Sequence, residues 1–195
     1  VAQACVAPAG ARGMTSMPSA IAALDWPAIT AHLDQEGWAV LPGLAGHFQE
    51  IGAAALDAIY PRLAPIAERW HRTLGKPLVR PIRAHAHAFV LREGEHRDMA
   101  GTANGELVFP LQLAALTSEP GLDFTGGEYV LVEQRPRMQS RPIVLPLRRG
   151  DAALIATADR PHPGSHGHYR VRMKHAISRV RSGARRGFEV VFEGR

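Results

Sequence analysis

The chain has 195 residues, of which 46% are hydrophobic and 21% are charged, and its formal net charge is +5. This length supports one domain with a substantial buried core, and the composition is that of an ordinary soluble protein rather than a fibrous or low-complexity one. The sequence has no run of about 18 apolar residues, so we expect no membrane span.

The basic charge and the cysteine content bear on partners and location. A basic surface attracts polyanions such as nucleic acid or anionic membranes, although an arginine-rich composition without a polyanionic partner accounts for the same charge. Cys5 is the single cysteine, which rules out an intrachain disulfide and favours a reducing compartment, so we expect a cytoplasmic protein. Residues 1–20 are rich in alanine but interrupted by proline and glycine, and they predict a disordered leader rather than a signal peptide.

Residues 21–75 are predicted to be mainly helical. Asp25 is a good cap for a first helix, and Gly37 is a good terminator for it. The apolar run 38–41 then predicts a short strand that ends at a Pro-Gly pair.

Two more helical stretches follow in the sequence. Residues 47–60 predict a helix that Pro61 breaks or kinks, because proline cannot continue the interior hydrogen-bond ladder. From residue 62 to 74 apolar positions recur at helical spacing, and Gly75 ends the pattern. Trp70 lies on the apolar face of this stretch and is predicted to be a core residue.

After Gly75 the sequence changes to short apolar runs separated by glycine, proline, aspartate and asparagine. This pattern predicts strands of an all-β sandwich or roll. We therefore predict an α+β fold in one domain, residues 21–195, with a helical N-terminal third (21–75) packed on a double-stranded β-helix, jelly-roll or cupin-like (76–195). The predicted strands are 88–92, 106–116, 128–133, 143–147, 152–157, 168–173 and 188–192.

The segment 170–192 carries the clearest chemical signal. It predicts two strands joined by a turn at Ser182-Gly183, with His175 on the first strand and Arg185 ten residues later on the second. The planar guanidinium of an arginine can pair a carboxylate at two points, which suits the binding of a 2-oxo acid.

A histidine and a carboxylate, His96 and Asp98, lie upstream at a spacing that puts both on one face of a strand. Together with His175 they would form the two-histidine, one-carboxylate ligand set of a non-haem Fe(II) oxygenase. A solvated loop around His96 is the simpler alternative. His85 and His87 are also two residues apart and could serve as ligands, but a strand face beside the core is the favoured interpretation.

Four sequence blocks resemble a bacterial family of 2-oxoglutarate- and Fe(II)-dependent oxygenases described as acting on damaged, alkylated DNA. The resemblance is close over residues 105–192 and looser around 37–43 and 60–67. It implies a double-stranded β-helix, an iron held by a His-x-Asp pair and a later histidine, and an arginine that binds 2-oxoglutarate. The blocks are residues 105–112 (GELVFPLQ), 118–140 (SEPGLDFTGGEYVLVEQRPRMQS), 146–151 (PLRRGD) and 169–183, which ends in HAISRVRSG.

The resemblance assigns roles to residues of this chain. His175 matches the later metal-binding histidine, and Arg185 matches the arginine that binds the 2-oxoglutarate co-substrate. His96 and Asp98 match the His-x-Asp pair, so the implied metal ligands are His96, Asp98 and His175.

The sequence departs from the family pattern next to this pair. The family has two residues and then Gly-Glu-Leu-Val-Phe-Pro directly after His-x-Asp, whereas here residues 102–105 intervene. We interpret these residues as an insertion; aligned without a gap, Ala100 and Thr102 would occupy the ligand positions. Ala176 replaces a favoured glycine, and the C-terminal Glu-Gly-Arg replaces a polar end that includes a histidine.

The activity implied by the resemblance is oxidative dealkylation. Fe(II), 2-oxoglutarate and O₂ would hydroxylate an N-methyl group on a DNA base, which then loses formaldehyde, and the base would have to be flipped out or already single-stranded. One alternative is the same chemistry on a small molecule or a protein side chain. Another is a catalytically degraded β-roll that serves only as a binding module.

Overall fold

A computed structural model describes residues 16–48, 53–101, 108–165 and 167–194. Residues 1–15 of the predicted leader therefore lie outside the described residues. The rest of that prediction is wrong, because α1 (Met17–Ala22) is helical and buries Ile21. Within the described parts no helix combines the length and apolar character needed to cross a membrane.

The first helices follow the signals in the sequence. In α2 (Trp26–Glu36) the Asp25 carboxylate accepts a hydrogen bond from Ala28 N at 3.1 Å, and Gly37 ends the helix in the left-handed conformation at φ 80°. The predicted strand is confirmed as β1 (Trp38–Leu41), and the short helix α3 (Ala45–Phe48) follows it.

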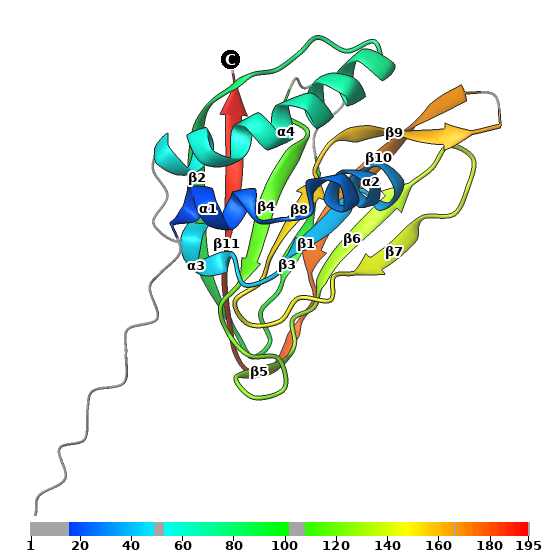
Figure 1. Cartoon of the computed structure of the whole chain (residues 1–195). Coiled ribbons are helices and arrows are strands. Elements are labelled where there is room, and N and C mark those ends of the chain that lie inside the picture. The colour runs from blue at the N-terminus through cyan, green and yellow to red at the C-terminus, as the bar shows by residue number, and fades with distance from the viewer. Residues whose placement is uncertain (1–15, 49–52, 102–107, 166, 195) are drawn as a thin grey trace, which may run out of the picture.

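Pro61 does not break the helix, so that part of the prediction is wrong. Helix α4 (Ala53–Thr73) continues through Pro61 and Pro65, although each proline removes one hydrogen bond from the ladder. The helix crosses the larger sheet (Figure 1) and buries one face against it. Burial of each large apolar side chain stabilises the fold by about 1.5–3 kcal/mol, so the combined burial outweighs the lost bonds. The buried residues of this face are Ile59, Leu63, Ile66, Ala67 and the predicted core residue Trp70.

Two antiparallel sheets form the rest of the molecule. After β2 the chain passes back and forth between them, which is the connectivity of a double-stranded β-helix, and the predicted fold class is confirmed. The larger sheet has the order β1, β8 (Ala152–Ala156), β4 (Leu111–Leu116), β11 (Val180–Gly194) and β2 (Pro81–Arg92), with β5 (Phe124–Gly126) also on β11. The smaller sheet has the order β3 (Arg97–Ala100), β10 (Gly167–Ile177), β6 (Tyr129–Gln134) and β7 (Arg141–Val144), with β9 (Asp159–Gly164) also on β10.

The segment 170–192 is not the hairpin that its sequence predicts. β10 ends at Ile177 in the smaller sheet, and β11 begins at Val180 in the larger one, so the chain crosses between sheets at residues 178–179. Gly183 lies inside β11 with φ 77°, and a Cβ there would lie 2.1 Å from Asp123 O. This glycine permits a close approach to β5 rather than a turn.

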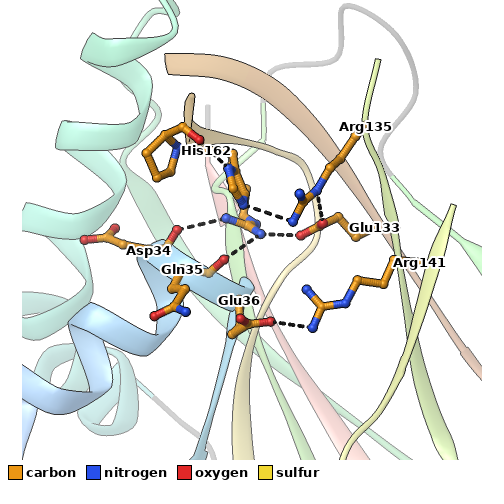
Figure 2. A network of polar contacts seen from close by, with 9 residues as sticks. Asp34, Gln35, Glu36, Glu133, Arg135, Arg141 and His162 are labelled. Carbon is orange, nitrogen blue, oxygen red and sulfur yellow. Dashed lines mark hydrogen bonds and ion pairs between the residues drawn. The ribbon is translucent and has the colours of Figure 1, made fainter. Parts of the chain in front are cut away.

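A polar network joins the C-terminal end of α2 to the smaller sheet (Figure 2). The buried Arg160 donates from NH1 to Asp34 O at 2.9 Å and from NH2 to Gln35 O at 3.1 Å, and it also pairs with the buried Glu133. Arg141 pairs with Glu36 at 3.1 Å beside it. Since the last carbonyls of a helix have no partner within the helix, Arg160 satisfies them and fixes α2 on the sheet.

Candidate active site

Arg185 lies on β11 at the wall of a cavity of about 320 Å³. Arg185 is only 1% exposed. Its Nε donates to Gly127 O at 2.8 Å, and its NH1 is buried with no hydrogen-bond partner among the described residues. Burial lowers the pKa of Arg185 to about 10, so it still carries its charge at neutral pH. A buried cation that has an unused donor and lines a cavity is suited to bind a carboxylate. The cavity is also lined by Leu116, Phe124, Tyr129, Leu145 and Leu147.

Two glycines allow Arg185 to lie against the backbone. At Gly127, which has φ +62°, a Cβ would approach Arg185 Cδ to 3.0 Å. At Gly187 a Cβ would approach Ala115 O to 2.4 Å and Arg185 NH1 to 3.1 Å. The absence of a side chain at Gly127 thus helps to position the arginine.

His175 faces the interior of the roll from β10. Its ring stacks on Tyr129 with centroids 6.1 Å apart, and Gln112 Nε2 lies 3.4 Å from His175 Nε2. Its Nδ1 is buried, and no described residue bonds to it. Burial lowers the pKa of His175 below its ordinary value, against the opposing effect of the Glu189 carboxylate. His175 is therefore neutral at neutral pH, which is the form that binds metal ions.

His96 immediately precedes β3, and Asp98 lies on it. His96 Nε2 is 3.1 Å from Asp98 Oδ1, but the two side chains are 47% and 96% exposed. Asp98 does line a cavity of about 260 Å³ together with His175. Opposite His175 in the strand register, however, stands Ala100.

The described residues contain no group of three His, Cys, Asp or Glu side chains placed to hold a metal ion. Arg185 is thus suited to bind 2-oxoglutarate, and His175 could bind Fe(II). His96 and Asp98, however, do not form a metal-binding group with His175 among the described residues. Ala100, which the gap-free alignment puts at a ligand position, is the register partner of His175. The predicted insertion, residues 102–105, lies outside the described residues. The ligand set His96, Asp98 and His175 stays a prediction.

Glu189 is an interior residue that the sequence reasoning missed. It is 6% exposed, its Oε1 accepts from the Tyr129 hydroxyl at 2.9 Å, and its Oε2 lies 2.8 Å from Arg97 NH1. Burial and this carboxylate raise the pKa of Tyr129 well above its ordinary value, so the hydroxyl remains a donor. Period-two spacing from Arg185 would have placed Glu189 on the same face of β11.

His85 and His87 lie on β2, as the strand alternative predicts; His85 is half-buried and His87 is exposed. His85 Nε2 is 3.3 Å from Glu193 Oε2, and His87 stands opposite Glu189 in the register. They belong to no metal-binding group within the part of the chain that the structure describes.

Comparisons with known proteins place these features in context. A family model described as "oxygenase, catalysing oxidative methylation of damaged DNA" matches residues 82–194. The chain is 38% identical over 155 residues to an uncharacterised protein of Mycobacterium tuberculosis strain H37Rv, a match that covers 70% of this chain and 65% of that protein. The chain therefore spans less than two thirds of that relative's length.

Solved structures share the fold at low sequence identity. A prolyl-4-hydroxylase of Pseudomonas putida superposes with a TM-score of 0.53 at 13% identity, covering 88% of this chain and 96% of that one. An oxidoreductase of the 2OG-Fe(II) oxygenase family from Burkholderia pseudomallei gives 0.50 at 13% identity, covering 88% and 91%. These likenesses support the double-stranded β-helix, and the Burkholderia protein belongs to a family named for Fe(II) and 2-oxoglutarate, the two cofactors that the family resemblance of this sequence implies.

Proposed function

Because the chain belongs to the family of oxygenases described as catalysing oxidative methylation of damaged DNA, we propose that it is a 2-oxoglutarate- and Fe(II)-dependent oxygenase that dealkylates DNA bases. The observation that carries the proposal is Arg185, a buried guanidinium whose NH1 has no partner among the described residues and which faces a cavity of about 320 Å³. A buried unpaired charge is costly, and a ligand carboxylate would compensate it.

In this proposal each residue has a separate task. Arg185 holds the distal carboxylate of 2-oxoglutarate, and the leucine and aromatic side chains of the cavity wall exclude water from it. His175 offers a neutral imidazole to Fe(II), and His96 and Asp98 are the predicted remaining ligands. Fe(II), when bound together with 2-oxoglutarate, supplies the oxidising chemistry that the protein's own side chains lack.

The net charge of +5 and the family description support DNA as the substrate. Phosphate contacts release counterions, so binding to DNA is expected to weaken steeply as salt rises. The same oxidation of a small molecule or protein side chain would show little dependence on salt. Activity on a methylated oligonucleotide measured across salt concentrations separates these substrates.

A second candidate function is a 2-oxoglutarate-binding roll without turnover. Ala100 opposite His175, and the absence of a three-residue metal group among the described residues, favour it. Anaerobic titration of the full chain with Fe(II) and 2-oxoglutarate, followed by visible difference spectroscopy and by succinate release in air, distinguishes the two. A charge-transfer band that is lost in His175→Ala, together with succinate, supports the oxygenase.

Binding of 2-oxoglutarate without the band or succinate supports the second candidate instead. Failure of the wild-type chain to bind 2-oxoglutarate overturns both. A band that persists in His175→Ala contradicts the assignment of His175 as a ligand.

A further inference from the structure

Strand β2 forms one edge of the larger sheet, and no described strand pairs with its outer side. The backbone donors and acceptors along such an edge are open to another strand. Strands β1, β3, β5, β7 and β9 also pair with a single neighbour among the described residues. They are short or interrupted, however, because β1, β3, β5 and β7 have three or four residues and β9 contains two prolines. β2 has 12 residues, so it is the long edge of the fold.

β2 also lacks the features that usually protect an exposed edge, which are charged side chains, proline and bulges. Residues 84–91 include no aspartate, glutamate, lysine, arginine or proline. The pairing of β2 with β11 runs without a bulge from residue 83 to residue 92. β2 therefore presents a regular edge about 34 Å long, at about 3.4 Å per residue.

Small apolar side chains lie beside this edge on one face of the strand. Ala86, Ala88 and Val90 are two residues apart and therefore share a face, and all three are exposed, Val90 to 46%. They line a hollow of about 350 Å³ together with the buried Phe188. Contiguous exposed apolar side chains mark an interaction surface, and a strand added to the edge would cover them.

The two ends of β2 differ in charge. Arg80 and Arg83 lie at its start, whereas Glu93 and Glu95 follow its last residue, Arg92, and all five are exposed. A second copy of the strand running antiparallel would bring the basic start of each copy to the net acidic end of the other. A parallel copy would bring like charges together, which is destabilising. The edge is therefore complementary to itself in the antiparallel direction.

We propose that two copies of this chain form a dimer through their β2 edges, which pair antiparallel about a two-fold axis at Ala88. In this register Ala86 of one copy faces Val90 of the other, and Arg83 faces Glu93. Exposed apolar side chains thus cover one another, and opposite charges meet at both ends of the contact. The two larger sheets become one continuous sheet.

Two physical reasons favour this register and a closed dimer. Pairing centred on Ala86 would place Arg80 opposite Arg92, and like charges directly opposite each other are destabilising. Both copies use the same surface, so the contact closes at two copies rather than growing into a filament. Backbone hydrogen bonds and a small apolar patch form an interface smaller than that of an obligate dimer, so we expect a dissociation constant of about 10 μM.

Sedimentation velocity of the full chain between about 1 and 200 μM should show monomer at the low end and dimer at the high end. Ala88→Glu and Ala88→Lys should each weaken dimerisation at least about 10-fold, because like charges then meet at the axis. An equimolar mixture of these two variants should dimerise again, because glutamate then faces lysine. Val144→Glu is the control, since Val144 is an exposed apolar residue on the edge strand β7, and it should leave the dimer unchanged.

The charges at the ends of β2 test the register. Arg83→Glu should weaken dimerisation about 10-fold, because it places two glutamates opposite each other at both ends. Adding Glu93→Arg to the same chain should restore the dimer. Urea unfolding of every variant identifies any that fail to fold.

A wild type that stays monomeric over the whole range, or that forms species larger than a dimer, overturns the inference. A dimer that persists in both Ala88 variants does the same, as does a mixture of those variants that stays monomeric. Loss of the dimer in Val144→Glu alone would assign the contact to β7 instead.

Discussion

Two arginines are buried among the described residues, and they differ in which groups their donors contact. Arg160 is 0% exposed and uses both terminal nitrogens, on two carbonyls at the end of α2 and on Glu133, while its Nε has no partner among the described residues. Arg185 is 1% exposed, donates from Nε to a backbone carbonyl, and keeps NH1 without a partner among the described residues.

This difference distinguishes an arginine that stabilises the fold, Arg160, from one that is available to bind a ligand, Arg185. In Arg160 the buried charge is compensated inside the protein, so its removal leaves a buried carboxylate and two carbonyls unsatisfied. In Arg185 the compensation is incomplete until a ligand arrives. Burial alone does not distinguish the two roles, and neither does an unused donor, because Arg160 Nε is also buried without a partner among the described residues. The buried carboxylate that pairs with Arg160 and the cavity beside Arg185 do distinguish them.

The largest effect is expected at the structural arginine. Arg160→Leu should lower the free energy of unfolding by about 3 kcal/mol, because Glu133 is left buried with only Arg135 beside it. Urea unfolding monitored by circular dichroism measures this loss. Arg141→Ala is the control: its side chain is 51% exposed in its pair with Glu36, and its removal should cost less than about 0.5 kcal/mol. A loss below about 1 kcal/mol in Arg160→Leu would remove the distinction between the two arginines.

Substitution of Arg185 should instead change the affinity for 2-oxoglutarate. Arg185→Leu should weaken 2-oxoglutarate binding about 100-fold while leaving the free energy of unfolding unchanged or slightly higher, because an unpaired buried charge is removed. Arg185→Lys should lose about 10-fold, since a lysine cannot pair a carboxylate at two points. Isothermal calorimetry and urea unfolding of the same preparations provide both readouts. A large stability loss with unchanged affinity would assign Arg185 a structural role.

A smaller effect is expected from the glycine that positions Arg185. Gly127→Ala adds a Cβ 3.0 Å from Arg185 Cδ at a φ of +62°, and it should cost about 1–2 kcal/mol of stability and several-fold in 2-oxoglutarate affinity. Gly43→Ala provides the comparison, because φ is +70° there and no atom lies within 4 Å of the added Cβ. It should lose stability but keep its affinity. Equal affinity loss in both variants would show that strain, rather than contact with Arg185, is responsible.

The smallest effect concerns pH. Burial lowers the pKa of His175 and of His71 in the folded protein below the ordinary value of 6.5. The unfolded chain therefore binds more protons just below pH 6.5, and stability falls as the pH falls from there toward the folded-state pKa values. His175→Asn should reduce the difference in the free energy of unfolding between about pH 7.5 and 5.5, measured by urea unfolding. His71→Asn should reduce the same difference independently. An unchanged slope in both variants would show that other groups cause the acid sensitivity.

Much of the fold could be read from local patterns. The cap at Asp25, the terminator at Gly37 and the strand after it depend on neighbouring residues, and each was predicted correctly. Pro61 misled the prediction because the burial of α4 against the sheet is not visible in a local window. The predicted turn at Ser182-Gly183 was wrong for a similar reason, because a glycine is required at 183 by the close approach of the Asp123 carbonyl, which is distant in the sequence.

The same contrast between local sequence pattern and tertiary contact applies to the candidate site. The sequence by itself determined the alternation that makes a roll, the basic charge, and the presence of one histidine and one arginine in a family-like block. Only the tertiary structure decided that Arg185 has a spare donor, that Glu189 and Arg97 share the interior with His175, and that Ala100 faces His175. Spacing along a strand fixes which face a side chain takes, but the register between strands far apart in the chain fixes what that side chain meets.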